Sequence, residues 1–216
     1  TTTLAGVTLS TATYGIGVDG QARITSQKDS LTGNVTSFTY GENNQMTGSK
    51  TVNASGATLS TSAYELGVDG RARIGSQTDT LTGNKTTFTY NNINNQLTSS
   101  QTANPAGTLL STTAYELGVD GQARAASQTD ELTGSITSFT YNESNNQLTG
   151  SNTQLNGVTL STAVYGLGID GQSRITSQTD SLTGNITSFN YDPQNRLISS
   201  RTMQGGFVVS SDQYEI

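Results

Sequence analysis

Larger side chains alternate with Ser and Thr in short stretches, and turns containing glycine separate these stretches. Such period-two alternation predicts half-buried β-strands. In the first repeat of the pattern, strands are expected at about 23–30 and 35–40 around the turn Leu31–Asn34, and at about 45–52 and 57–64 around Asn53–Gly56. The Gly33-Asn34 pair is expected to supply the positive φ that a tight hairpin turn needs. Each repeat is therefore predicted to contain two β-hairpins.

The pattern recurs four times along the chain. The Asp-Gly pairs begin at Asp19, Asp69, Asp120 and Asp170, with spacings of 50, 51 and 50 residues. The expected repeats are residues 14–63, 64–114, 115–164 and 165–213, in one array over 1–216. The first part of each repeat is always 26 residues from Tyr to Tyr, whereas the second part is 24, 25, 24 or 23. Surface loops absorb changes in length, so the variation is expected in the turns of the second part.

Apolar side chains are too sparse for a conventional core. Hydrophobic residues make up 31% of the 216 residues and charged residues 12%, with 24 glycines against 2 prolines. We therefore expect an all-β repeat array of β-hairpins, in double-hairpin units of about 50 residues stabilised by their neighbours, that forms a spiralling sheet, hollow shell, tube or solenoid-like fibre. Copies are expected to align Tyr and Asn side chains in columns and to be held in register by Asp19, Arg23, Asp29, Tyr40, Asp69, Arg73, Asp79, Tyr90, Asp120, Arg124, Asp130, Tyr141, Asp170, Arg174, Asp180 and Tyr191.

Charge and residue types exclude several function classes. The net charge of −6 argues against binding to nucleic-acid phosphates, and no apolar run is long enough for a transmembrane helix, so no membrane insertion is expected. The chain has no Cys and no His. Disulfides, zinc sites built on Cys or His, and the usual base–nucleophile pairs are therefore not available. We expect no cofactor and no enzymatic activity.

Three stretches resemble a known repeat. YDPQNRLISS from Tyr191, LTGNVTSFTY from Leu31 and DGQARITS from Asp19 are similar to segments of the tyrosine-aspartate (YD) repeat of Rhs, wall-associated and teneurin-like proteins. The resemblance implies β-hairpins wound into a spiral sheet, often a hollow shell around a toxin or an extracellular scaffold. The sequence departs from that pattern where Gln45, and its equivalents Gln96 and Gln147, replace the arginine seen at Arg196. The close similarity of the copies favours a regular fibre or tube.

The repeated acids and arginines admit two interpretations. As a catalytic set, the two acids of each repeat would form a carboxylate pair for hydrolysis, with the arginine holding the substrate. As structural residues, the acids would belong to turns and the arginine would form an ion pair. The structural interpretation is favoured, because one sheet seldom carries four equal active sites. Calcium is disfavoured because each repeat offers two carboxylates, whereas the ion takes six to eight oxygen ligands.

Two further features suggest contact with glycans. Asn-x-Ser/Thr sequences make candidate glycan acceptors of Asn34, Asn84, Asn185, Asn53 and Asn142, although local turn and strand chemistry also explains these residues. Rows of Tyr, with the Asn-Asn-Gln tracts that start at Asn43, Asn94 and Asn145, could bind sugars by stacking. Such side chains also stabilise stacked sheets, which is the favoured interpretation.

A structural role is the favoured function. We expect an extracellular or cell-surface repeat protein whose units stack into a fibre, tube or shell wall, with the chain itself as the main partner. The repeat runs from Tyr14 to Tyr214 without capping units, so strand edges are expected at both ends. One alternative is an adhesin whose Tyr and Asn rows bind surface glycans. A weaker alternative is a segment of a toxin-encapsulating shell of the Rhs type.

Overall fold

The described part of the chain consists of β-strands and turns. The computed structural model describes residues 2–4 and 7–215, and the chain forms two compact units, Thr1–Leu110 and Ser111–Ile216. The first nine strands are β1 Thr2–Leu4, β2 Val7–Ile16, β3 Ala22–Asp29, β4 Val35–Tyr40, β5 Met46–Val52, β6 Thr58–Leu66, β7 Ala72–Asp79, β8 Lys85–Tyr90 and β9 Leu97–Ala103. The others are β10 Leu109–Leu117, β11 Ala123–Asp130, β12 Ile136–Tyr141, β13 Leu148–Leu155, β14 Val158–Leu167, β15 Ser173–Asp180, β16 Asn185–Tyr191, β17 Leu197–Gln204 and β18 Phe207–Gln213.

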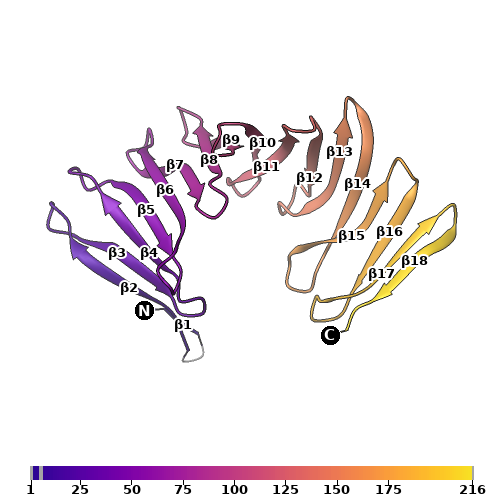
Figure 1. Ribbon diagram of the computed structural model, residues 1–216, viewed down its shortest axis with the longest axis horizontal. Coiled ribbons are helices and arrows are strands. Elements are labelled where there is room, and N and C mark those ends of the chain that lie inside the picture. The colour runs from indigo at the N-terminus through magenta and orange to yellow at the C-terminus, as the bar shows by residue number, and fades with distance from the viewer. Residues whose placement is uncertain (1, 5–6, 216) are drawn as a thin grey trace. The chain divides into compact units, whose positions relative to one another are not determined.

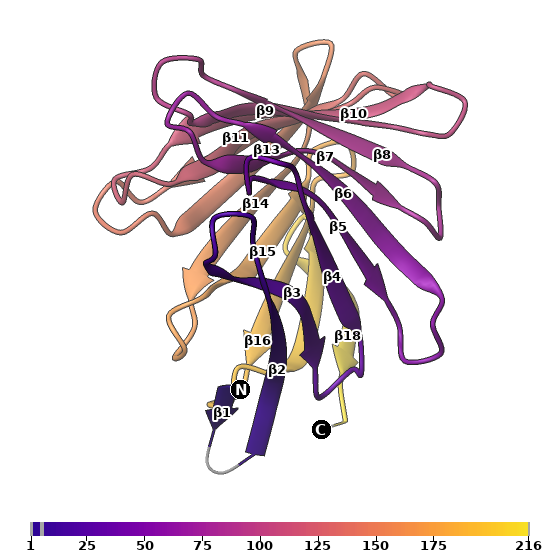
Figure 2. The same cartoon turned by 90° about the vertical axis from the view of Figure 1, so that its left-hand side faces the viewer.

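The strands of each compact unit follow one another as antiparallel neighbours. In the first unit every strand from β1 to β8 pairs with the next strand in the sequence. In the second unit the same holds from β10 to β17 (Figures 1 and 2). The predicted all-β array of β-hairpins is confirmed, and the strands of the first repeat begin and end within about two residues of the expected positions.

The turns lie along two opposite edges in each unit, because consecutive antiparallel strands reverse direction. The Asp-Gly edge carries the turns 17–21, 41–45, 67–71 and 91–96 in the first unit, and 118–122, 142–147, 168–172 and 192–196 in the second. The Leu-Thr-Gly edge carries 30–34, 53–57, 80–84 and 104–108 in the first unit, and 131–135, 156–157, 181–184 and 205–206 in the second.

Changes in repeat length are confined to two turns of the second part. One is the Asn-rich turn of the Asp-Gly edge, which spans 41–45 in the first repeat and 91–96 in the second. The other is the last turn of each repeat. It is a five-residue loop at 53–57, but in the third repeat only Asn156 and Gly157 remain, with φ of 52° and 80°. Positive φ at both positions is the signature of a two-residue hairpin turn whose twist matches its strands.

The Leu-Thr-Gly turns differ from the expected geometry in one residue. Gly33 has a φ of 72°, as predicted, but Asn34 is not in the left-handed region. The Gly33 N–H donates to the Asp29 carbonyl and the Asp29 N–H donates to the Asn34 carbonyl, both at 2.9 Å. The loop therefore spans more residues than a two-residue hairpin turn, and glycine alone takes the conformation that other side chains disfavour.

β-Bulges recur at equivalent positions of the repeats. Thr25 is the extra residue of β3, because Thr13 faces Ser26 and Tyr14 faces Ile24. Equivalent register shifts occur in the β6–β7, β10–β11 and β14–β15 pairs. Further shifts interrupt the β4–β5 and β5–β6 pairs and their counterparts. Because a bulge bends its strand and increases the local twist, each repeat carries the same local distortions.

No hydrophobic side chain is buried among the residues that the structure describes. The most buried polar side chains are Ser100 and Ser200, which face Phe88 and Phe189 on the neighbouring strands. Many aliphatic side chains are more than half exposed, including Leu31 and its equivalents Leu81, Leu132 and Leu182. Backbone ladders and contacts between adjacent strands and turns must therefore supply the stability that a core supplies elsewhere.

Columns of identical side chains do not form between adjacent strands. Tyr40 lies on β4 and its equivalent Tyr90 on β8, four strands further along the sheet. At about 4.8 Å between neighbouring strands, equivalent residues are about 19 Å apart. The expectation of stacked Tyr and Asn columns is therefore wrong within a compact unit. Instead, threonine hydroxyls pair within each repeat at 2.8 to 2.9 Å, as in Thr36–Thr51 and Thr137–Thr153.

Candidate functional site

The Asp-Gly turns have the same geometry in all four repeats. The Gly20 N–H donates to the Gly17 carbonyl and Gly20 has a φ of 75°, so glycine is required there. The Asp19 carboxylate accepts the Gln21 N–H at 3.1 Å, and Asp69, Asp120 and Asp170 make the equivalent bond. The hydrogen bond from Gln21, with a smaller contribution from Arg23, lowers the pKa of Asp19. The acid of each Asp-Gly pair is thus a turn residue.

An asparagine side chain joins this turn to the next turn along the same edge. The Asn44 amide oxygen accepts the Val18 N–H at 3.0 Å, and Asn95, Asn146 and Asn195 accept the N–H of Val68, Val119 and Ile169 at 2.9 to 3.1 Å. Each of these asparagines has a φ close to 60°. A Cβ at Gly17 would lie 2.7 Å from the Asn44 oxygen, so a side chain there would collide with the clamp.

The asparagine clamp consists of Asn44, Asn95, Asn146 and Asn195 with the glycines Gly17, Gly67, Gly118 and Gly168. Sequence reasoning missed both members. The Asn-Asn-Gln tracts drew attention to their first asparagine, whereas the second one makes the bond. The signal was nevertheless present, because a glycine stands two residues before the aspartate in every repeat.

A tyrosine and an arginine lie beside the clamp in each repeat. The Tyr40 hydroxyl donates to the Ile24 carbonyl at 2.7 Å, and Tyr90, Tyr141 and Tyr191 make the equivalent bond at 2.8 to 2.9 Å. The Arg73 and Arg124 guanidinium groups lie 4.3 and 4.4 Å from the ring centroids of Tyr90 and Tyr141, and Arg23 lies 5.9 Å from that of Tyr40. Such stacking of a cation on an aromatic face stabilises this edge.

The arginine has two kinds of acidic partner. In the first and fourth repeats it pairs with the aspartate of its own turn, as in Arg23–Asp19 and Arg174–Asp170. In the second and third repeats its Nε donates at 2.9 Å to a glutamate on the preceding strand, Glu65 or Glu116. These pairs lie within a repeat. The idea that the acid and arginine connect successive copies is therefore wrong for these contacts, although Gln147 does reach the Gly171 carbonyl of the next repeat at 2.9 Å.

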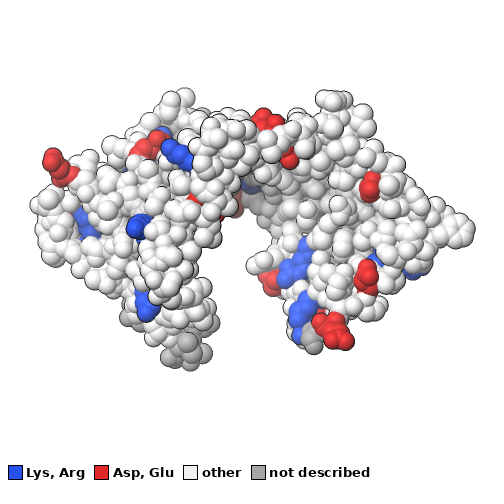
Figure 3. All heavy atoms as spheres, viewed as in Figure 1, with Lys and Arg blue, Asp and Glu red and all other residues white. Residues whose placement is uncertain are grey.

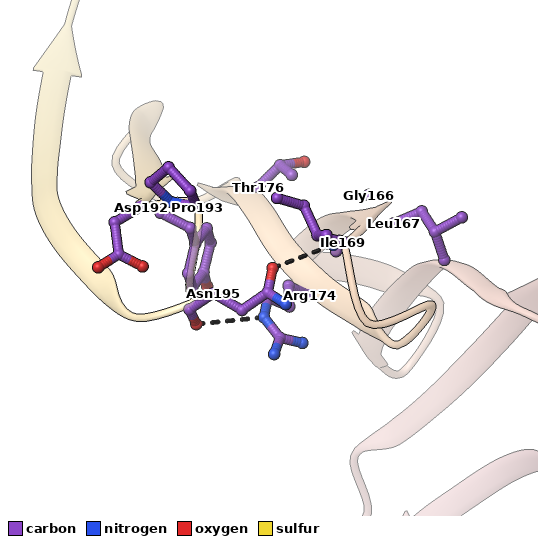
Figure 4. A pocket seen from close by; sticks show the side chains of 10 residues that line it. Gly166, Leu167, Ile169, Arg174, Thr176, Asp192, Pro193 and Asn195 are labelled. Carbon is purple, nitrogen blue, oxygen red and sulfur yellow. Dashed lines mark hydrogen bonds between the residues drawn. The ribbon is translucent and has the colours of Figure 1, made fainter.

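A hollow opens beside the arginine where the glutamate is absent. In the fourth repeat it has a volume of about 360 Å³ and is lined by Gly166, Leu167, Arg174, Tyr191 and Asn195 among others (Figure 4). The equivalent hollow of the first repeat has a volume of about 220 Å³ and is lined by Gly15, Ile16, Arg23, Tyr40 and Asn44 among others. In both repeats the residue facing the arginine across the strands is a glycine.

The second acid of each repeat lies at the opposite edge. The Asp29 carboxylate accepts the N–H groups of Leu31 and Thr32 at 2.8 and 2.9 Å, and Asp79, Asp130 and Asp180 do the same. The bonds from Thr32 and Leu31 lower the pKa of Asp29. Asp19 and Asp29 are separated by the length of β3, more than about 20 Å. They cannot form a carboxylate pair for glycoside hydrolysis, which needs a separation of about 5 to 9.5 Å.

The candidate glycan acceptors differ in accessibility. Asn142 is exposed, and its side chain accepts the Ser144 N–H in a turn. Asn53 is half-buried, and its amide oxygen accepts hydrogen bonds from Ser55 and Ala57. Asn34, Asn84 and Asn185 are also half-buried at the Leu-Thr-Gly edge. Accessibility therefore favours Asn142 over the other four.

Charged side chains and side chains that could bind a metal ion are sparse among the described residues. On the face shown in Figure 3, most of the surface is uncharged, and several of the few charged side chains lie next to one of opposite sign. Within residues 2–4 and 7–215, no group of three or more Asp, Glu, His or Cys side chains is placed to hold a metal ion. Over the same residues, none of the secondary structure is a helix long and apolar enough to cross a membrane.

Comparisons with known proteins give neighbours of low similarity. No protein-family model matches the chain, and no curated protein matches it. Among solved structures, a TcdB2-TccC3-Cdc42 complex shares 16% identity over 91% of this chain, with a TM-score of 0.32. The Tc holotoxin pore of Photorhabdus luminescens shares 15% identity over 94%, with a TM-score of 0.33. This chain covers only 14% of the length of either of these neighbours.

A porin-like protein from Bacteroides uniformis is similar over a larger share of its own length. It shares 15% identity over 83% of this chain and 86% of that one, with a TM-score of 0.40. At these scores the neighbours give no information on the fold, substrate, partner or assembly of this chain.

Proposed function

We propose that the chain is a structural repeat segment of an extracellular or cell-surface fibre, tube or shell wall. The observation that supports this most is the combination of a four-fold repeat with the absence of buried hydrophobic side chains in the described part of the chain. A sheet held by ladders and turn contacts can keep both faces in solvent. A wall between two aqueous spaces needs that property.

The local chemistry supports a scaffold more than a catalyst. The acids that could have formed a catalytic pair lie at opposite edges, and each accepts backbone N–H groups of its own turn. Repeated arginines pair with acids and stack on tyrosines. All these groups are used to fix turns, which is how a repeat keeps a constant shape along an array.

The experiment for this proposal is sedimentation of the purified chain over a wide concentration range, followed by electron microscopy of the same samples. Association into regular fibres, tubes or curved walls is expected, since an array stabilised by its neighbours gains from each added unit. A monodisperse monomer at every concentration would contradict self-assembly of the chain.

A surface that binds glycans is the second candidate. The hollow of the fourth repeat places the aromatic ring of Tyr191 beside Pro193 and Arg174, and tyrosine rings are a common platform for sugars. A glycan array probed with the labelled chain tests this function, and binding that is lost in Tyr191→Ala but kept in Tyr214→Ala would support it. An array without hits would exclude it for the glycans displayed.

A further inference from the structure

We propose that the hollows beside Arg23 and Arg174 are binding sites for an organic carboxylate on a short aliphatic arm, such as propionate or a glutamate side chain. One site lies at the Asp-Gly edge of the first repeat and the other at that of the fourth, each in a different compact unit. The inference does not depend on the proposed structural role.

The second and third repeats show what fits this position. There the hollow's place is taken by Glu65 and Glu116, which face Arg73 and Arg124 across adjacent strands. In both repeats a glutamate Oε1 accepts the arginine Nε–H at 2.9 Å. The guanidinium then lies close to the tyrosine ring, and its Nη1 donates to the clamp asparagine at 2.6 to 2.7 Å.

The first repeat keeps the donor but lacks the acceptor. Arg23 pairs with Asp19 through a terminal nitrogen, while its buried Nε has no hydrogen-bond partner. A buried N–H without a partner is unfavourable, because it has lost its hydration without replacement. In the fourth repeat Arg174 Nε makes a long bond of 3.3 Å to the Asn195 carbonyl. A carboxylate arriving from solution would satisfy both donors as Glu65 satisfies Arg73.

The space for the arm follows from two small residues. Gly15 and Gly166 stand where the other repeats have glutamate, and Thr25 and Thr176 line the hollows beside them, so no carboxylate of the repeat itself enters the hollow. Leu167 and Ile169 line it in the fourth repeat, and Figure 4 shows Ile169 beside Asn195 and Leu167 farther from Arg174. Both aliphatic side chains are exposed. They offer apolar contact to methylene groups that accompany the carboxylate.

The neighbouring aspartate limits the affinity. Asp19 and Asp170 are negative and pair with the arginine of their own repeat, so binding requires the guanidinium to move to the position seen for Arg73. We therefore expect a dissociation constant in the millimolar range for propionate. Selectivity for a carboxylate over other anions comes from the paired N–H groups of the guanidinium and from the apolar flank.

The experiment is an NMR titration of the arginine Nε–H signals of the ¹⁵N-labelled chain with sodium propionate. Saturable shifts are expected for Arg23 and Arg174, and none for Arg73 and Arg124. Sodium chloride at equal ionic strength and neutral propionamide are the controls. Equal shifts at all four arginines, no saturable shift at Arg23 and Arg174, or the same response to chloride would overturn the proposal.

Two matched variants exchange the residues at these two positions between the kinds of repeat. Gly15→Glu with Thr25→Ala gives the first repeat the residues of the third repeat at these positions, and should abolish the response of Arg23 while Arg174 still responds. Glu65→Gly with Gly75→Thr gives the second repeat the residues of the first, and should make Arg73 respond. Unchanged backbone spectra outside the altered repeat show that each variant is folded. A first-repeat variant that still binds at Arg23 would contradict the proposed position of the carboxylate.

The same titration distinguishes two sources of the carboxylate. If the occupant is a glutamate side chain of a second copy, the Arg23 and Arg174 signals will shift as the protein alone is concentrated, and propionate will compete. If the occupant is a free acid, these signals will be independent of protein concentration until propionate is added.

Discussion

The first and fourth repeats differ from the second and third at the residue that faces the arginine present at the same position of every repeat. Gly15 and Gly166 face it in the outer pair, and Glu65 and Glu116 in the inner pair. A second position changes with the first. Thr25 and Thr176 accompany the glycines, whereas Gly75 and Ala126 accompany the glutamates. The two kinds of repeat share their strand order and their Asp-Gly turns, but the Asn-rich turn that carries the clamp asparagine has five residues in the outer pair and six in the inner pair.

Steric contact explains why the two positions change together. A Cβ at Gly15 would lie 2.9 Å from the Thr25 methyl group, and one at Gly166 would lie equally close to Thr176. A Cβ at Gly75 would lie 3.3 Å from the Glu65 carboxylate. One large residue therefore excludes another across the bulge. The bulge and the arginine therefore form one packing unit with two alternative fillings. One is a threonine at the bulge with a glycine opposite the arginine, and the other is a glutamate opposite the arginine with a small residue at the bulge.

The largest effect is expected from Gly118→Ala, which attacks the clamp that both kinds of repeat share. The new Cβ would lie 2.5 Å from the Asn146 amide nitrogen, so Asn146 must leave the Val119 N–H and the Arg124 guanidinium. We expect the free energy of unfolding to fall by about 2 kcal/mol. Urea denaturation measures this. Because the damage acts through Asn146, the double variant with Asn146→Ala should lose little more than either single variant; additive losses would show that the clamp is not the cause.

Exchange of the two fillings should produce a smaller effect with a clear pairwise signature. Gly15→Glu alone overpacks the bulge against Thr25 and should cost about 1 to 2 kcal/mol. Adding Thr25→Ala should recover about 1 kcal/mol, because the two residues are in contact. A double-mutant cycle by urea denaturation gives the coupling energy. Two independent, additive effects would contradict the alternative-filling account.

The paired threonines offer a test that does not depend on the kind of repeat. Thr137→Val leaves the half-buried Thr153 hydroxyl without its partner at 2.8 Å, and should cost about 0.5 to 1 kcal/mol. Replacing both by valine removes the unpaired hydroxyl, and should restore most of the loss. Thermal and urea unfolding of the single and double variants measure the difference. A double variant that is less stable than the single variant would show that the hydrogen-bonded hydroxyl pair contributes more to stability than the packing of the two valines that replace it.

The smallest effect is expected from titration of the exposed acids at the Leu-Thr-Gly edge. Hydrogen bonds from Thr133 and Leu132 lower the pKa of Asp130, and Asp29 and Asp180 are lowered in the same way. A lowered folded-state pKa gives stability that is present above the unfolded-state pKa and is lost as the pH falls through the folded-state value. The urea midpoint should therefore decline below about pH 4. Asp130→Asn should be less stable than the wild type at neutral pH and should show a shallower decline; an equal slope would contradict this role.

Most of the fold could be predicted from local patterns in the sequence. Alternation and turn glycines predicted the hairpins, and the varying 23- to 25-residue spacing correctly located the turns that change length. The columns of Tyr and Asn failed because antiparallel pairing interposes three other strands between Tyr40 and Tyr90. The repeat period was visible in the sequence, but the number of strands that separate copies decides which side chains meet.

The contacts of the Asp-Gly edge were harder to predict. Asn44 and Val18 lie 26 residues apart and meet only because two turns are adjacent on one edge. In some repeats the arginine pairs with the aspartate of its own turn, as with Asp19, and in others with a glutamate, as with Glu65. Which partner it has depends on the residue that faces it on the neighbouring strand and on the extra residue of the bulge. Each of these contacts is marked in the sequence by a pair of positions. The glycine and the asparagine of the clamp stay constant among the repeats, whereas the residue facing the arginine and the bulge residue change together. A comparison among the four repeats reveals them, whereas any single repeat does not.

Hydrogen exchange at the clamped amides tests the central claim most directly, namely that turn contacts within each repeat replace a hydrophobic core. The amides of Val18, Val68, Val119 and Ile169 lie in exposed turns, and each donates to a clamp asparagine. We predict slow exchange at all four in the wild-type chain, and in Asn146→Ala a loss of protection at Val119 with the other three unchanged. Fast exchange at all four amides in the wild-type chain, or equal loss at all four in the variant, would contradict the account.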